Sequence, residues 1–182
     1  MDVKKGMVTY IELCEDNMTL ELFEDFQRKQ NVTKCWRKVN DEWVINDIAF
    51  IDDWTEQEYF ELFLNLKNTI QTNGFVVGAF VDGQLKGFAS VEGNLFGSKC
   101  EYVNLSNIHV SKEMRGKGIG RELFRNATVW AKNYGAQKLY ISAHSAIESQ
   151  AFYHSMRCVE AKEYNINLVE KEPFDRQLEY IL

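Results

Sequence analysis

The segment from Val103 to Trp130 constrains the fold of this chain more than any other. An apolar stretch typical of a strand runs into the glycine-rich sequence RGKGIG at positions 115–120, and an amphipathic helical pattern follows. A turn of this kind leaves backbone N–H groups unpaired where the helix begins. Together with the positive end of the helix dipole, these donors favour a phosphate group. The segment therefore predicts a strand, a phosphate-binding turn and a helix.

Spacing separates this turn from two other phosphate-binding loops. A dinucleotide-binding fingerprint needs a third glycine where this chain has Arg121. A Walker A loop needs Lys followed by Ser or Thr at the start of the helix, and Ile119-Gly120 stands there instead. The pattern that remains is R-x-x-G-x-G, formed by Arg115, Gly118 and Gly120.

Composition narrows the class of protein. A chain of 182 residues with 45% hydrophobic and 26% charged residues predicts one globular domain over residues 1–182. Its net charge of −6 argues against general nucleic-acid binding, and no apolar run is long enough to cross a membrane. The four cysteines lack C-x-x-C spacing, so we expect free thiols, no metal and a cytoplasmic protein.

Periodicity and turn signals predict the remaining elements. The helix that starts at a Thr55–Glu58 capping box and the helix closed by Gly135 carry the strongest signals. Asn40-Asp41 and Asp82-Gly83 each indicate a hairpin. The expected strands are 7–12, 33–39, 43–50, 75–81, 85–92, 102–110, 138–142, 158–165 and 177–182, and the expected helices are 16–30, 55–73, 117–134 and one around 149–153.

The R-x-x-G-x-G motif resembles the pyrophosphate-binding signature of the GNAT superfamily, the acetyl-CoA-dependent N-acetyltransferases. That family places the motif between its fourth strand and third helix, here 102–110 and 117–134. Residues 138–142 resemble the fifth strand, and Phe152-Tyr153 lies in a segment similar to the fourth helix. The resemblance covers residues 70–182 well and the N-terminal part loosely. It implies a mixed α/β (α+β) domain: a mostly antiparallel twisted sheet with splayed fourth and fifth strands, about four flanking helices, and a hairpin inserted between helices one and two.

The resemblance also implies acetyl-CoA as cosubstrate. The pantetheine arm is expected to lie between the splayed strands and to pair with backbone groups of Ile108 and Val110, while the phosphates meet the N–H groups of residues 115–120. Strand alternation predicts that the His109 side chain points away from that of Ile108, toward a helix-covered face. The predicted coenzyme-binding residues are Ile108, His109, Val110, Arg115, Gly116, Lys117, Gly118, Ile119, Gly120, Arg121, Ser149 and Tyr153.

Direct acetyl transfer to a primary amine needs a neutral amine, a polarised carbonyl and a stabilised thiolate. Tyr153 matches the family's general acid, and the Ile108 N–H is the predicted oxyanion donor. Some relatives carry a Glu or His base where this chain has Asn104 or Ser106, and neither residue is a base. His144 is the predicted base or relay.

Two points about this site stay open in the sequence. Glu92 or a chain of waters are alternatives to His144 as the base. Many relatives carry Asn where this chain has Ala146, and Ser145 or Ser149 is expected to supply the missing hydrogen bond to the coenzyme.

The acceptor is expected to contact residues 33–53 and the loop 170–175, where Trp and Asp side chains suit an amine. Small amines and protein amines are both compatible with this composition. A non-catalytic acyl-CoA-binding or regulatory module is the alternative function, and a simple nucleotide-phosphate binder is a third. The chain is expected to be a monomer or a homodimer paired through an exposed strand 177–182.

Overall fold

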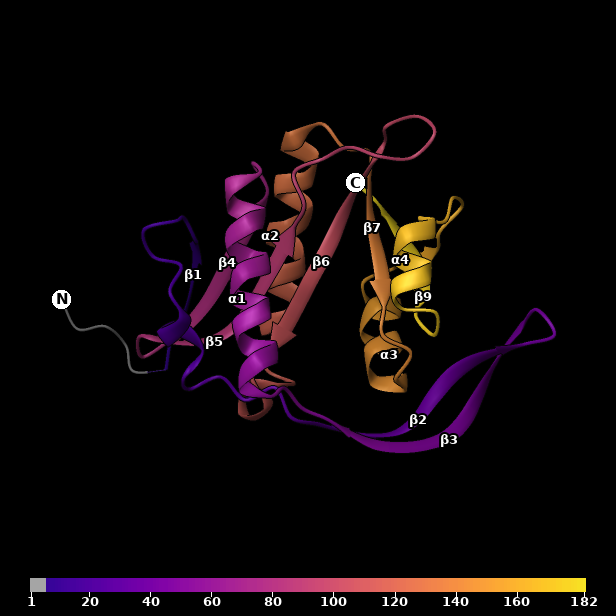
Figure 1. The fold of residues 1–182 in the computed structure, drawn as a ribbon, viewed down its shortest axis with the longest axis horizontal. Helices are drawn as coiled ribbons and strands as arrows, with labels where there is room; N and C mark the ends of the chain where they lie inside the picture. Colours follow the sequence, from indigo (N-terminus) through magenta and orange to yellow (C-terminus); the bar gives the residue numbers. More distant parts are fainter. Residues whose placement is uncertain (1–5) are drawn as a thin grey trace.

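The computed structural model describes residues 6–182, and it contains a seven-stranded sheet and a separate two-stranded hairpin (Figure 1). In chain order the elements are β1 (Val8–Glu12), the 3₁₀ turn η1 (Leu20–Phe23), β2 (Gln30–Val39), β3 (Glu42–Asp52), α1 (Glu56–Gln71), β4 (Phe75–Val81), β5 (Gln84–Val91), β6 (Tyr102–Val110), η2 (Lys112–Met114), α2 (Ile119–Tyr134), β7 (Lys138–Ala143), α3 (Ile147–Ser155), β8 (Val159–Glu160), α4 (Ile166–Lys171) and β9 (Arg176–Ile181).

The large sheet has the strand order β1-β4-β5-β6-β7-β9-β8. Every neighbouring pair is antiparallel except β6 and β7, which run parallel. Helices α1 and α2 lie on opposite faces of the sheet, and the β2–β3 hairpin extends away from it below α3 (Figure 1). The predicted mixed, mostly antiparallel fold is therefore confirmed.

Strand β4 shows why the central strands are apolar along their whole length. Val76 packs in one core cluster with Leu66 of α1, whereas Val77 packs in another with Leu123 of α2. Neighbouring residues of a strand point to opposite faces, and both faces here are covered by a helix. The strand accordingly has no polar face.

The strongest local signals are confirmed. Asn40 and Asp41 have φ of 48° and 64°, which is the left-handed pair of a type I′ hairpin turn between β2 and β3. Asp82 and Gly83 make the same turn between β4 and β5, with φ of 49° and 82°. Helix α2 ends at Gly135 in the left-handed conformation.

The helix predicted over residues 16–30 is wrong. Only Leu20–Phe23 is helical, and it forms a single 3₁₀ turn. Its hydrogen bonds join residues three apart, such as the Glu24 N–H and the Glu21 carbonyl. Phe23 and Phe26 are buried against Phe88, with ring centroids 5.7 and 5.3 Å away. The apolar residues whose spacing suggested a helix are instead buried from an irregular segment.

The C-terminal region also differs from the prediction. The strand expected over 158–165 is only Val159–Glu160, and α4 occupies residues that were expected to be loop. Asn165 caps this helix by accepting a hydrogen bond from the Leu168 N–H. Strand β9 lies between β7 and β8, so the expectation that it is an exposed edge for dimer pairing is wrong.

The capping box of α1 predicts a measurable stability effect. The Thr55 Oγ1 accepts from the Glu58 N–H at 3.3 Å, and the Glu58 carboxylate accepts from the Thr55 N–H at 2.7 Å. Thr55→Ala should lower the free energy of unfolding by about 1 kcal/mol in urea denaturation, because it leaves a helix N–H unpaired. Thr128→Ala, inside α2, is the control and should not destabilise the protein. Equal stability of the wild type and Thr55→Ala would contradict the assigned cap.

Candidate active site

Strands β6 and β7 diverge in the middle of the sheet. Their parallel pairing covers Tyr102–Asn104 opposite Lys138–Tyr140 and stops there. Beyond that point β6 continues to Val110, paired with β5 alone, while β7 pairs only with β9. The predicted splay is therefore present, and it leaves one side of the second half of β6 without a strand partner within the described residues.

Hydrogen-bond alternation shows which backbone groups of β6 face this gap. In an antiparallel pair only every second residue bonds to the partner strand. The Ser111 N–H donates to the Lys86 carbonyl at 2.8 Å, which makes His109 the next residue bonded to β5. Ile108 and Val110 therefore direct their backbone groups away from β5 and toward β7, as the resemblance implied.

The turn before α2 depends on glycine for two different reasons. Gly116 and Gly118 have φ of 75° and 85°, a conformation that L side chains rarely adopt, although a Cβ at either would meet open space. Gly120 has no such φ, but a Cβ there would lie 3.3 Å from Cε2 of Phe152. The first two glycines are needed for backbone shape, and the third for packing against α3.

The turn presents a run of unpaired backbone donors. Within residues 6–182, no backbone or side-chain acceptor takes the N–H groups of residues 116–121. The Arg115 N–H, which was expected to belong to this run, donates weakly to the Lys112 carbonyl at 3.4 Å. Because α2 begins at Ile119, these donors coincide with the positive end of its dipole. The arrangement is suited to an anion such as a diphosphate.

The Arg115 side chain is occupied by the protein itself. Its guanidinium donates to three backbone carbonyls, those of Val110, Arg28 and Lys29, at 3.0, 2.6 and 3.1 Å. The Lys112 N–H adds a bond of 2.8 Å to the Gln27 carbonyl. Arg115 therefore holds residues 28–29, which lead into the β2–β3 hairpin and are called the hairpin arm below, against the phosphate turn.

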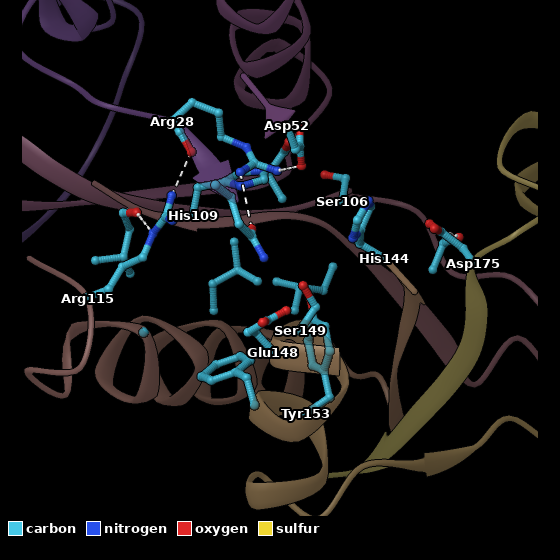
Figure 2. Close-up of a pocket in the computed structure, with 18 of the residues that line it drawn as sticks. Arg28, Asp52, Ser106, His109, Arg115, His144, Glu148, Ser149, Tyr153 and Asp175 are labelled. Carbon is cyan, nitrogen blue, oxygen red and sulfur yellow. Dashed lines mark hydrogen bonds and ion pairs between the residues drawn. The ribbon is translucent and has the colours of Figure 1, made fainter. Parts of the chain in front are cut away.

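A cleft of about 1090 Å³ runs along the gap, larger than the roughly 300–1,000 Å³ typical of small-ligand pockets. Figure 2 shows Arg28, Asp52 and His109 on one side of it and Glu148, Ser149 and Tyr153 of α3 on the other. Lys117, a predicted coenzyme-binding residue, is absent from the lining, and its ammonium lies 3.5 Å from the Met114 sulfur. The lining residues predicted from the sequence are Ile108, His109, Val110, Arg115, Gly116, Gly118, Ile119, Gly120, Arg121, His144, Ser149 and Tyr153.

Tyr153 is buried on α3 and borders the cleft. Burial raises the pKa of its hydroxyl well above the ordinary value, and Cys158 and Asp175 add to the effect. The hydroxyl is therefore protonated at neutral pH. Within the described residues it has no hydrogen-bond partner. Such a group is available to donate a proton to a ligand.

His144 follows β7 and lines the same cleft. Burial lowers the pKa of its imidazole, although the nearby Asp52 opposes this effect, so the ring is neutral at pH 7. The Ala146 N–H donates to Nδ1 at 3.3 Å, which places the proton of the neutral ring on Nε2. In this tautomer Nε2 is a hydrogen-bond donor.

His109 points away from Ile108, as alternation predicted. Its ring lies 4.8 Å from Trp54 and 5.3 Å from Phe88, on the face covered by α1. Burial lowers its pKa well below the ordinary value, and Arg28, Arg115 and His144 lower it further. The ring is thus a neutral part of the wall of the cleft.

The two serines proposed for coenzyme binding differ. The Ser145 hydroxyl is buried and accepts a hydrogen bond from Arg37 at 2.6 Å, and Ser145 does not line the cleft. Of the two alternatives, this favours Ser149. Ser149 does line it. Glu92, an alternative base, also lies in the lining.

Sequence reasoning missed Arg28, which is 8% exposed and forms an ion pair with Asp52 in the cleft wall. Its guanidinium also lies 5.1 Å from the ring centre of Trp54. A lone arginine near the end of a predicted helix carries no signal that it will meet an aspartate 24 residues later.

The buried His109 predicts a pH-dependent stability. Its pKa is lower in the folded than in the unfolded state, so the unfolded state binds more protons and stability falls as the pH drops below about 6.5. Between pH 7.5 and pH 5, His109→Phe should lose less stability than the wild type in urea denaturation. Exposed His154→Asn is the control and should follow the wild type. Identical pH dependence of His109→Phe and the wild type would contradict this assignment.

Comparisons with known proteins agree with this geometry. The structure is similar to a provisionally assigned streptothricin acetyltransferase of Bacillus anthracis strain Ames, solved with acetyl coenzyme A, with a TM-score of 0.69 and 17% identity over 97% of this chain and 98% of that one. It is also similar to nourseothricin acetyltransferase, with a TM-score of 0.66 and 17% identity over 94% and 95% of the two chains. At these identities the likeness establishes the fold.

Sequence comparison gives the family. Part of the chain is 50% identical over 40 residues to YobR, an uncharacterised N-acetyltransferase of Bacillus subtilis strain 168, and the match spans 22% of this chain but only 16% of that protein. The profile of the acetyltransferase (GNAT) family matches residues 22–156, which is most of the chain. The chain therefore belongs to the GNAT family of acetyltransferases.

Proposed function

We propose that this protein transfers an acetyl group from acetyl-CoA directly to a primary amine. The observation that carries the proposal is the run of unpaired N–H donors at residues 116–121, beside a gap in the sheet. These donors suit the diphosphate of the cosubstrate. The outward N–H and carbonyl of Ile108 and the outward N–H of Val110, whose carbonyl accepts from Arg115, suit its pantetheine arm. Arg121 and Ser149, both in the lining, are the side chains that would assist.

The cleft also offers groups for the chemistry. The Ile108 N–H, which faces the gap, would polarise the thioester carbonyl as an oxyanion donor. The protonated Tyr153 hydroxyl would supply the proton to the leaving thiolate. His144, with its proton on Nε2, would donate a hydrogen bond within the cleft. Acetyl-CoA itself supplies the activated acyl group.

The cleft lining combines carboxylates with aromatic rings. Asp52, Glu92 and Asp175 belong to it together with Trp54 and Phe50. Carboxylates and aromatic rings both favour a cationic amine. The names of the similar structures, a nourseothricin acetyltransferase and a provisionally assigned streptothricin acetyltransferase, support a small-molecule acceptor. We place the reaction in the cytoplasm. Within residues 6–182, no helix is long and apolar enough to cross a bilayer.

The first experiment asks whether the protein turns over at all. Purified protein, acetyl-CoA and each of spermidine, glucosamine, L-lysine and a lysine-containing peptide should be assayed by thiol release. The proposal expects amine-dependent thiol release with at least one of these amines. Binding of acetyl-CoA in calorimetry without turnover of any amine would favour the alternative, a non-catalytic acyl-CoA-binding module. Equal affinity for ATP would instead indicate a general nucleotide-phosphate binder.

The role of Tyr153 predicts a separation of turnover from binding. Tyr153→Phe removes only the hydroxyl, so turnover should fall about 100-fold or more, while the affinity for acetyl-CoA stays near that of the wild type. Tyr164→Phe is the matched control, because Tyr164 bonds to Glu160 outside the cleft and should not affect turnover. Wild-type turnover in Tyr153→Phe would exclude the hydroxyl as the acid.

A further inference from the structure

Asp175 stands at the start of the last strand, where the sheet borders the cleft. It precedes β9, whose first residue, Arg176, pairs with Ala143 at the end of β7. Its carboxylate lines the cleft and is close enough to Tyr153 to raise the pKa of that hydroxyl. Figure 2 shows Asp175 toward the same end of the opening as His144. A carboxylate therefore shares the cleft with the proposed general acid.

A directed chain of hydrogen bonds leads to this carboxylate. The Asn165 N–H can only donate, and it donates to the Tyr140 hydroxyl at 2.9 Å. Tyr140 must then give its own proton to Gln177 Oε1, at 2.6 Å. This fixes the Gln177 amide so that its Nε2 donates to Ser142 Oγ at 3.1 Å. The Ser142 proton is left for Asp175 Oδ2, at 3.1 Å.

The direction of this chain restricts what Asp175 can do. Every donor in it points toward the carboxylate, so Asp175 acts as the final acceptor. Its other oxygen, Oδ1, accepts no hydrogen bond within residues 6–182 and is not sealed from the cleft. Tyr140 and Gln177 are 0% and 3% exposed, and burying such polar groups is costly unless they are fully bonded.

We propose that Asp175 is the general base that receives the ammonium proton of the acceptor, and that Ser142, Gln177 and Tyr140 are its positioning residues. The inference rests on the proposed acetyl transfer. In the step, the acceptor R–NH₃⁺ gives one proton to the Asp175 carboxylate and becomes R–NH₂. The amine nitrogen then bonds to the thioester carbon, and the C–S bond breaks. The thiolate takes one proton from Tyr153, and the nitrogen gives its second proton through water to the resulting tyrosinate and keeps the third as the amide N–H. Asp175 then releases its proton to solvent.

The surroundings of Asp175 suit this task. Burial raises its pKa to about 6, and Glu172 raises it too, while Ser142 and Arg37 of β2 oppose the shift. Compared with an ordinary aspartate, this makes the carboxylate about 100-fold more basic. His144 cannot serve as readily, because its Nδ1 already accepts the Ala146 N–H. Asp175 thus supplies the base that Asn104 and Ser106 do not.

The pH dependence of turnover tests the base directly. With spermidine, glucosamine, L-lysine and the lysine-containing peptide as probes, wild-type kcat should rise with pH around a midpoint near 6, because only the carboxylate form accepts a proton. Asp175→Asn should lower kcat about 100-fold or more, remove this acid limb, and leave the affinity for acetyl-CoA unchanged. Glu61→Gln, an exposed acid on α1 outside the cleft, is the control and should match the wild type.

Ser142→Ala tests the positioning residues. It removes a donor that lowers the Asp175 pKa, so the acid limb should move to higher pH, a change that a merely structural role would not produce. In aspartate-labelled wild-type protein, ¹³C NMR should show a carboxyl titrating near pH 6 that is lost in Asp175→Asn. If Asp175→Asn does not fold, Ser142→Ala and the wild-type titration still decide the matter.

The outcomes distinguish this inference from the function on which it rests. Wild-type turnover and an unchanged acid limb in Asp175→Asn would overturn the base assignment and leave acetyl transfer intact. An acid limb that stays in place in Ser142→Ala, or no carboxyl titrating near pH 6, would also overturn it. Failure of the wild type to acetylate any of the four amines would contradict the proposed function itself.

Discussion

The divergence of β6 from β7 after Asn104 and Tyr140 is the feature on which the site depends. A sheet that stayed paired would consume the outward backbone groups of Ile108 and Val110 in a ladder. Because the strands part, these groups face the cleft instead, and the chain next forms the turn whose N–H groups at 116–121 are free. One interruption of the sheet thus leaves two sets of free backbone groups on the same cleft, one at Ile108 and Val110 and one at residues 116–121.

Contacts elsewhere in the molecule fix the positions of these backbone groups. Helix α2 packs against the sheet on the side opposite α1, and its N-terminus fixes the position of the turn. The Arg115 guanidinium ties the turn to the carbonyls of Arg28 and Lys29, so the hairpin arm and the phosphate turn are positioned together. On the far wall, Gly120 lets α2 approach Phe152 of α3. Side chains here shape a site whose proposed contacts to the cosubstrate are mostly backbone.

The features that could be predicted from the sequence are local ones. The glycine turn, the Thr55 capping box and the two hairpins each lie within a few residues, so their signals survive in a single sequence. The irregular segment around Phe23 was mistaken for a helix because apolar residues three apart fit either structure. The short α4 was missed because its cap at Asn165 lay inside a predicted strand.

The contacts that could not be predicted join distant parts of the chain. The Arg28–Asp52 pair spans 24 positions, and the Tyr140–Gln177 hydrogen bond spans 37. The register of the β2–β3 hairpin, with Gln30 opposite Asp52, brings the first pair together, and the pairing of β7 with β9 brings together the second. The residues of the phosphate turn could be predicted because their signal is local. Their proposed function depends on backbone shape, which the glycines determine.

Backbone amide NMR tests the central claim most directly. In ¹⁵N-labelled protein, coenzyme A should shift the amide resonances of residues 116–121 strongly, and pantetheine, which lacks the diphosphate, should shift those of Ile108 and Val110 while leaving 116–121 nearly unchanged. Equal shifts at 116–121 with both ligands, or none with coenzyme A at saturation, would contradict the assignment of the turn as the diphosphate site.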